Sequence, residues 1–146
     1  ADLWLAGDGP DNTRLVKLTA ACRRPHHVRF FGYWSAVEEL YAAADVLLAP
    51  ARDAGLGLST MEAIACGLPV VATDIPAMRR LVEHERTGLL VPPDDPDALA
   101  NAALRLLNDR ALAQQFARNA LQTAERFHIR HTVEQTAPLY RRLTRG

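Results

Sequence analysis

Short hydrophobic runs alternate with longer amphipathic stretches along the first 93 residues of the chain. A short apolar run bounded by turn residues is typical of a buried strand, whereas apolar residues spaced three or four apart are typical of a helix. The predicted strands are residues 3–6, 28–31, 46–49, 69–72 and 88–91. The predicted helices between them are residues 11–22, 36–44, 60–66 and 76–83. This alternation predicts an α/β fold, a parallel sheet flanked by helices.

From residue 94 onward the pattern is helical throughout. Asp95 is suited to an N-cap, Pro96 to the first helical position and Asp97 to the first turn, and apolar residues then recur at positions 99, 102, 103 and 106. Two further helices are predicted at residues 111–125 and 129–142. Without a repeat or a low-complexity linker, residues 1–146 are predicted to form one domain, with strand–helix alternation over 1–93 and C-terminal helices over 94–146.

The composition is that of an ordinary globular domain, with 146 residues, 49% hydrophobic and 23% charged. This length is sufficient for one full core. Seventeen basic and seventeen acidic residues cancel, so we expect no nucleic-acid partner. Cys22 and Cys66 lie far apart, which suggests neither a disulfide framework nor a zinc site. With no apolar run near the roughly 18 residues of a membrane span and no signal peptide, a reduced cytoplasmic location is expected.

The last part of the chain is rich in arginine. Residues 126–146 contain five arginines against a single acidic residue, Glu134. Such a segment is either solvated or in weak contact with an anionic membrane surface, which would make the protein peripheral to the membrane. We favour the solvated interpretation.

Ligands of open α/β sheets bind beyond the carboxyl ends of the strands, so the loops that leave a strand and enter a helix are the informative ones. The first of these loops, Gly7-Asp8-Gly9-Pro10, has two glycines of a dinucleotide fingerprint but Asn12 in place of the third. No acidic residue follows about 20 positions later, as NAD binding requires. This loop is therefore interpreted as a glycine turn before a helix.

The loop after the third predicted strand contains the strongest candidate site. Gly55 and Gly57 precede a helix start, where backbone N–H groups and the positive end of the helix dipole favour an anion such as phosphate. Glu62 follows. Ser59-x-x-Glu62 matches a capping box, in which Glu62 only satisfies a backbone N–H. Alternatively, the Glu62 carboxylate accepts hydrogen bonds from the diol of a ribose. The spacing alone does not separate these two roles.

A third loop carries two aromatic residues, Tyr33 and Trp34, followed by Ser35. The aromatic side chains could stack on a planar ring or line a pocket, and they could equally belong to the core.

Six segments follow one another in a specific order over nearly the whole chain. They are Leu5-Ala6-Gly7-Asp8-Gly9-Pro10, Val28-x-Phe30-x-Gly32, Tyr41-Ala42-Ala43-Ala44-Asp45-Val46, Pro50-x-x-x-x-Gly55-x-Gly57, Glu62-Ala63-x-Ala65-x-Gly67-x-Pro69-Val70-Val71-Ala72 and Thr87-Gly88-Leu89-Leu90-Val91-Pro92. This ordered set resembles the nucleotide-binding C-terminal half of the retaining GT-B glycosyltransferases, the "glycosyl transferases group 1" family. The resemblance implies a Rossmann-like domain that is truncated at its N-terminus.

The resemblance also implies a function and a site. Such enzymes transfer a sugar from a nucleotide diphosphate donor to a glycan, lipid or small-molecule acceptor, with retention of configuration and usually without a metal or other cofactor. By resemblance, Glu62 binds the ribose hydroxyls, the loop Tyr33-Trp34-Ser35 meets the base, and the phosphate or sugar is held by Gly55, Leu56, Gly57, Leu58, Ser59 and Thr60. By the same resemblance, we expect the full-length protein to be a hexosyltransferase.

The chain departs from the family pattern at several points. The family's basic pair and its N-terminal acceptor lobe are absent from this chain. The first of two family glutamates falls on Ala54, with Asp53 one residue out of register, and a third acidic position falls on Arg80. The catalytic residue is therefore unassigned. We expect the chain to be inactive by itself, and the rival interpretation is a non-catalytic binding or assembly module.

The resemblance further implies a central strand between residues 3–6 and 46–49 that this chain lacks. Both neighbouring strands would then expose unpaired edges, which buried sheets rarely tolerate. We expect either strand exchange between copies, which would produce a homo-oligomer, or a longer parent protein.

Overall fold

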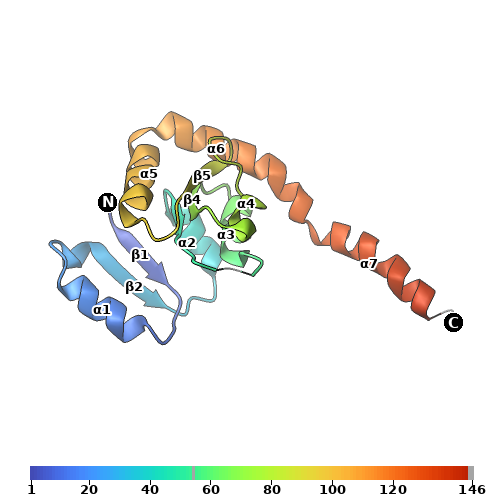
Figure 1. The fold of residues 1–146 in the computed structure, drawn as a ribbon, viewed down its shortest axis with the longest axis horizontal. Helices are drawn as coiled ribbons and strands as arrows, with labels where there is room; N and C mark the ends of the chain where they lie inside the picture. Colours follow the sequence, from blue (N-terminus) through green and yellow to red (C-terminus); the bar gives the residue numbers. More distant parts are fainter. Residues whose placement is uncertain (54, 145–146) are drawn as a thin grey trace. The chain divides into compact units, whose positions relative to one another are not determined.

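The computed structural model describes residues 1–53 and 55–144. The chain forms two compact units, Ala1–Val37 and Glu38–Gly146 (Figure 1).

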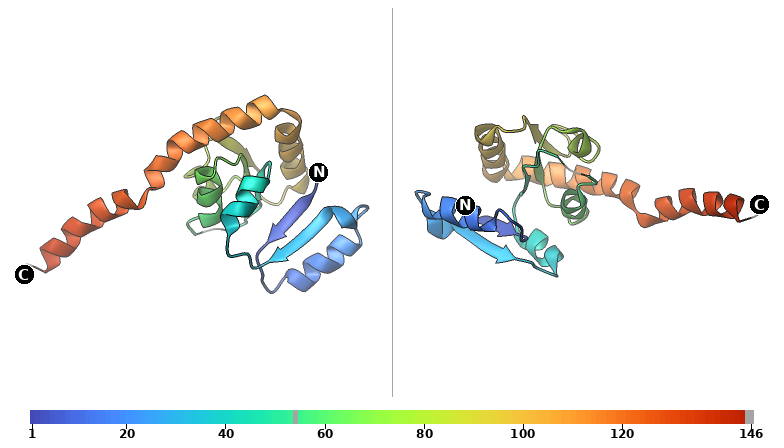
Figure 2. Two further views of the ribbon diagram at one scale, coloured as in Figure 1. Left: turned by 180° about the vertical axis from the view of Figure 1, so that it is seen from behind. Right: turned by 60° about the horizontal axis from the view of Figure 1, so that its bottom comes forward.

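The first unit is a pair of parallel strands with one α-helix. Its elements are β1 (Leu3–Ala6), α1 (Asn12–Ala20), the short 3₁₀ helix η1 (Pro25–His27) and β2 (Val28–Gly32). The strands pair in register from Leu3 opposite Val28 to Leu5 opposite Phe30. Figure 2 shows from two further directions that α1 runs alongside this strand pair.

The second unit is a three-stranded parallel sheet with helices. The sheet order is β3-β4-β5. Its elements are α2 (Val37–Ala43, which begins at the unit boundary), β3 (Leu47–Ala49), α3 (Leu58–Ala65), β4 (Val70–Thr73), α4 (Pro76–Arg79), β5 (Gly88–Val91), α5 (Pro96–Asn108), α6 (Arg110–Ala124), the 3₁₀ helix η2 (Glu125–Phe127) and α7 (Ile129–Leu143).

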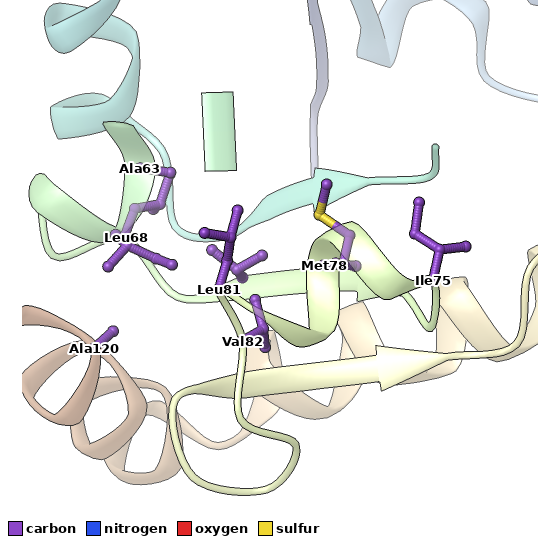
Figure 3. Packing of buried hydrophobic residues seen from close by; sticks show 10 residues of the cluster. Ala63, Leu68, Ile75, Met78, Leu81, Val82 and Ala120 are labelled. Carbon is purple, nitrogen blue, oxygen red and sulfur yellow. The ribbon is translucent and has the colours of Figure 1, made fainter. Parts of the chain in front are cut away.

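The central strand β4 is buried on both faces, because successive side chains of a strand point to opposite sides. Val70 and Ala72 belong to one buried cluster, together with residues of α3 and α4, and Val71 belongs to a second cluster with Leu106 of α5 and Phe116 of α6. Figure 3 shows the first cluster, which includes Ile75 just before α4, Met78 within α4, and Leu81 and Val82 in the turn after it. Helices therefore cover both faces of this sheet, and the loops at its carboxyl edge are anchored to a packed core.

The strand–helix alternation predicted from the sequence is confirmed, and all five strands and seven α-helices are present. The cap at Asp95 is also confirmed, since its carboxylate accepts a hydrogen bond from the Ala98 N–H at 2.8 Å. Several helix boundaries differ from the prediction by one or two residues, and the end of α4 differs by four. α3 begins at Leu58, two residues early, because Gly57 takes the cap position. α4 ends at Arg79 because the chain turns there to bury Leu81 and Val82.

In the part of the chain that the structure describes, both strands that were expected to flank the missing strand, β1 and β3, are edge strands. There, β1 has only β2 as a strand neighbour and β3 has only β4. This agrees with the expectation of two unpaired edges. β1 and β3 belong to different sheets, so each unit has its own open edge.

Candidate functional site

The first half of the loop between β3 and α3 is held by two hydrogen-bonding contacts, one to the end of β4 and one to Asp94 after β5. The Thr73 hydroxyl at the end of β4 donates a hydrogen bond to the Ala51 carbonyl. The Arg52 guanidinium pairs with the Asp94 carboxylate across 42 residues of sequence, with the Nε and Oδ1 atoms 2.5 Å apart. A cavity of about 440 Å³ opens beside these contacts and is lined by Pro50, Arg52 and Thr73 among others. The loop therefore leaves the sheet in a defined direction.

The second half of the loop ends at Gly57, which has a left-handed backbone with a φ of +66°. Its carbonyl accepts hydrogen bonds from the N–H groups of Thr60 and Met61, both at 3.0 Å. A Cβ atom at Gly57 would lie 2.9 Å from Leu81 Cδ1 and 2.9 Å from Met78 Cε. Gly57 is thus required by the fold itself, whether or not a ligand binds. At Gly55, by contrast, an added Cβ atom would meet no atom of the described residues within 4 Å, its chain neighbours aside.

The N-terminus of α3 is left without a side-chain cap. The N–H group of Ser59 has no protein acceptor within residues 1–53 and 55–144. Unpaired N–H groups and the helix dipole together make such an end favourable for an anion. Among the described residues, the helix start can therefore receive a phosphate without loss of a protein hydrogen bond at Ser59.

The Glu62 carboxylate forms a hydrogen bond with a side chain rather than with the backbone. The Tyr41 hydroxyl of α2 donates to Glu62 Oε2 at 3.0 Å. The capping-box alternative for Glu62 is wrong, because Gly57 is the N-cap and Ser59 is already the second residue of the helix. Glu62 consequently lies in the second turn, and its exposed carboxylate keeps lone pairs for a ligand.

Burial of the Tyr41 ring and the neighbouring carboxylate raise the pKa of Tyr41 to about 12. The hydroxyl is therefore protonated at any ordinary pH and acts as the donor in its hydrogen bond with Glu62.

The other residues predicted in this loop have different environments. Thr60 is fully buried, with its hydroxyl 3.5 Å from Met78 Sδ. Its side chain therefore packs in the core beneath the helix start and does not face solvent. Leu56 and Leu58 are 74% and 60% exposed, which leaves apolar surface beside the helix start. Ala54 lies outside the described residues, and Arg80 is an exposed residue directly after α4.

Tyr33, Trp34 and Ser35 belong to the first unit. The Trp34 ring stands edge-on to Phe31 with a centroid distance of 5.6 Å, and Phe31 in turn lies 5.2 Å from the Trp4 ring. Trp34 thus serves partly as packing, whereas the Tyr33 side chain is 85% exposed and available for stacking. Ser35 is also exposed.

Sequence reasoning missed the roles of Tyr41 and Arg52. Tyr41 opens one of the six ordered segments, so the sequence marked its position without indicating its partner. The sequence does not indicate that Arg52 pairs with Asp94, because basic and acidic residues occur at many places along the chain and any of them could form such a pair.

Metal-binding groups and membrane-spanning helices are both absent from the part of the chain that the structure describes. No group of three or more His, Cys, Asp and Glu side chains there is arranged to hold a metal ion. No helix in the same residues has the length and apolar character needed to span a bilayer.

The comparisons with known proteins agree with one another. Residues 1–123 match the family model described as glycosyl transferases group 1. The chain is similar to the lipopolysaccharide core biosynthesis mannosyltransferase LpsB of Rhizobium meliloti (strain 1021), with 37% identity over 121 residues that cover 81% of this chain and 34% of LpsB. It is also similar to N-acetyl-alpha-D-glucosaminyl L-malate synthase of Bacillus anthracis, with 30% identity over 96% of this chain and 37% of that protein.

Solved structures show the same similarity. Sucrose-phosphate synthase from Thermosynechococcus elongatus superimposes with a TM-score of 0.90 and 33% identity, over 98% of this chain and 38% of that one. Anabaena Alr3699/HepE, solved in complex with UDP, gives a TM-score of 0.87 and 27% identity, over 96% of this chain and 40% of that one. The chain spans well under half the length of each of these four proteins.

Proposed function

The chain belongs to the glycosyl transferases group 1 family and has the fold of its GT-B enzymes, and from this premise we propose that it binds the nucleotide-sugar donor of a retaining glycosyltransferase. The observation that carries the proposal is the Glu62 carboxylate, which is exposed, free of any capping role and located on the same helix as the uncapped N–H of Ser59. Alr3699/HepE, which the chain resembles, was also solved in complex with UDP-glucose.

The proposed binding mode follows from the chemistry of the donor. When the bond to the sugar breaks, charge develops on the diphosphate, and positioned hydrogen-bond donors stabilise it. The start of α3 supplies such donors at Ser59 and the adjacent loop, and Gly55 allows close approach of the phosphate or sugar. Glu62 accepts hydrogen bonds from the ribose hydroxyls. Tyr33, Trp34 and Ser35 contact the base.

The finer parts of the proposal concern the whole protein. The transferred group is a hexose, the acceptor is a glycan, a lipid or a small molecule, and no metal is required. Residues outside this chain supply the acceptor lobe and the basic pair, so the chain alone is inactive. A strand from a longer parent protein or from a second copy completes the open edges of β1 and β3. The protein acts in the cytoplasm, and the Arg-rich C-terminal segment is its candidate contact with a membrane surface.

A non-catalytic binding module is the second candidate. The observation that favours it is Arg80, a basic residue where the family has an acidic one, together with Ala54 at the first glutamate position. Binding of a nucleotide sugar by the full-length protein with neither hydrolysis nor transfer would support this candidate. Turnover of the donor would exclude it.

The proposal is tested by a thermal-shift panel of UDP, GDP and ADP sugars. A ligand at 100 times its dissociation constant adds about 2.7 kcal/mol of stability, so the preferred base is identified directly. Calorimetry then compares the wild type with Glu62→Ala. We expect the affinity for the nucleotide to fall roughly 10- to 150-fold. This corresponds to about 1.5–3 kcal/mol, the typical contribution of a hydrogen bond to a charged group. Glu134→Ala, which removes an exposed carboxylate of α7, is the matched control and should bind normally. An unchanged affinity in Glu62→Ala would refute the proposed role of Glu62.

A further inference from the structure

Tyr41 and Glu62 are brought together from two different helices. Tyr41 lies on α2 and Glu62 on α3, 21 residues later, and the Tyr41 ring packs against the buried cluster that includes Ala63 and Ile64. The ring is thus held by the core while its hydroxyl reaches the exposed carboxylate at 3.0 Å. The hydroxyl is the more firmly anchored partner of the two.

The hydrogen bond occupies only one of the two carboxylate oxygens. Glu62 Oε2 accepts the Tyr41 proton, and a carboxylate has about four acceptor sites in total. A free glutamate side chain loses considerable rotamer freedom when it binds a ligand. Since Tyr41 already restricts the carboxylate, the Glu62 side chain has less rotamer freedom to lose when a ligand binds at Oε1.

Resting on the function proposed above, we infer that Tyr41 is a positioning residue that orients the Glu62 carboxylate toward the ribose diol, so that the pair selects ribonucleotides over 2′-deoxyribonucleotides. Two neighbouring hydroxyls match a carboxylate whose direction is fixed, whereas a single hydroxyl forms half of that contact. The loss of one hydroxyl therefore removes one of the two hydrogen bonds to the carboxylate, which lowers the affinity for the deoxy form.

The experiment uses Tyr41→Phe, which keeps the ring in the core and removes only the hydroxyl. Calorimetry measures the affinity of the full-length protein for UDP and 2′-deoxy-UDP, and for the guanosine and adenosine pairs. We expect the wild type to prefer the ribonucleotide of the best-bound base by about 10-fold or more. In Tyr41→Phe, the affinity for that ribonucleotide should fall about 3- to 20-fold, and its preference over the deoxy form should shrink. Tyr140→Phe, a change at an exposed tyrosine of α7, is the matched control.

A double-mutant cycle separates positioning from a merely structural tie between α2 and α3. If Tyr41 acts through Glu62, Tyr41→Phe should have no further effect on affinity in the Glu62→Ala background. Additive losses would overturn the inference, and so would an unchanged ribose preference in a folded Tyr41→Phe protein. Failure of the wild type to bind any of the six nucleotides would instead refute the proposed function itself. The two failures are thus distinguishable.

Discussion

Gly57 and Gly55 form a matched pair that separates the structural role of the loop from its binding role. Ala at Gly57 would hold a left-handed backbone, which costs a residue with a Cβ atom about 1–2 kcal/mol. The added carbon would also lie 2.9 Å from Leu81 Cδ1 and from Met78 Cε. Overpacking of a core typically costs about 1–3 kcal/mol, and these two contact atoms are the ends of flexible side chains that can yield. We therefore expect Gly57→Ala to lower the free energy of unfolding by about 2–4 kcal/mol.

The measurement is urea unfolding supported by scanning calorimetry. A loss of this size corresponds to a fall in Tm of roughly 6–15 °C for a domain of this length. Gly55→Ala is the control for stability, because the new side chain faces open space, and its unfolding free energy should change by about 0.5 kcal/mol or less. Its nucleotide affinity should nevertheless fall if a ligand approaches the loop closely. A Gly57→Ala protein as stable as the wild type would refute the left-handed conformation of Gly57, and a strongly destabilised Gly55→Ala protein would refute the open space at Gly55.

Three further predictions concern stability. Gly88→Ala should lower the free energy of unfolding in urea by about 3 kcal/mol or more, because the added Cβ would lie 2.5 Å from the Val70 carbonyl oxygen of the neighbouring strand. A backbone atom cannot move aside as the end of a side chain can. Normal stability of Gly88→Ala would contradict this packing. Asp95→Ala removes the N-cap of α5 and should cost about 1 kcal/mol in the same assay, whereas an unchanged midpoint would show that the cap contributes nothing. The Arg79 guanidinium holds the pKa of Asp74 below its ordinary value, so this pair stabilises the fold above about pH 4 and the effect is lost as the pH falls through the folded pKa. The Tm of Asp74→Asn should accordingly depend less on pH between 6 and 3, and an identical pH profile would contradict the role of the pair.

Much of the fold could be predicted from the sequence because each element has a local cause. The apolar residues at 88–91 lie between turn signals, and Asp95 with Pro96 marks a helix start whatever else surrounds it. The boundaries of α3 and α4 could not be predicted in this way. The start of α3 depends on the left-handed Gly57, and the end of α4 depends on the burial of Leu81.

The sequence predicted which residues form the candidate site but not the contacts that these residues make in the fold. The glycine loop and Glu62 follow from spacing, yet spacing left Glu62 equally suited to a capping box and to a ribose. The structure excludes the capping box, since Ser59 is inside the helix and the carboxylate accepts a hydrogen bond from Tyr41, and the ribose contact is a proposal. Thr60 was expected, by resemblance, to contact the phosphate or sugar, and it is fully buried in the fold.

The sequence by itself determined the order of strands and helices and the location of the glycine loop at a carboxyl edge of the sheet. These depend on periodicity, turn residues and spacing, which act over a few neighbouring residues. Only the tertiary structure decided that Tyr41 meets Glu62, that Arg52 meets Asp94 and that Gly57 is required by packing as well as by its backbone. The physical reason is that such contacts join residues about 20 to 40 positions apart, and the packing of whole helices and strands brings them within hydrogen-bond or van der Waals distance.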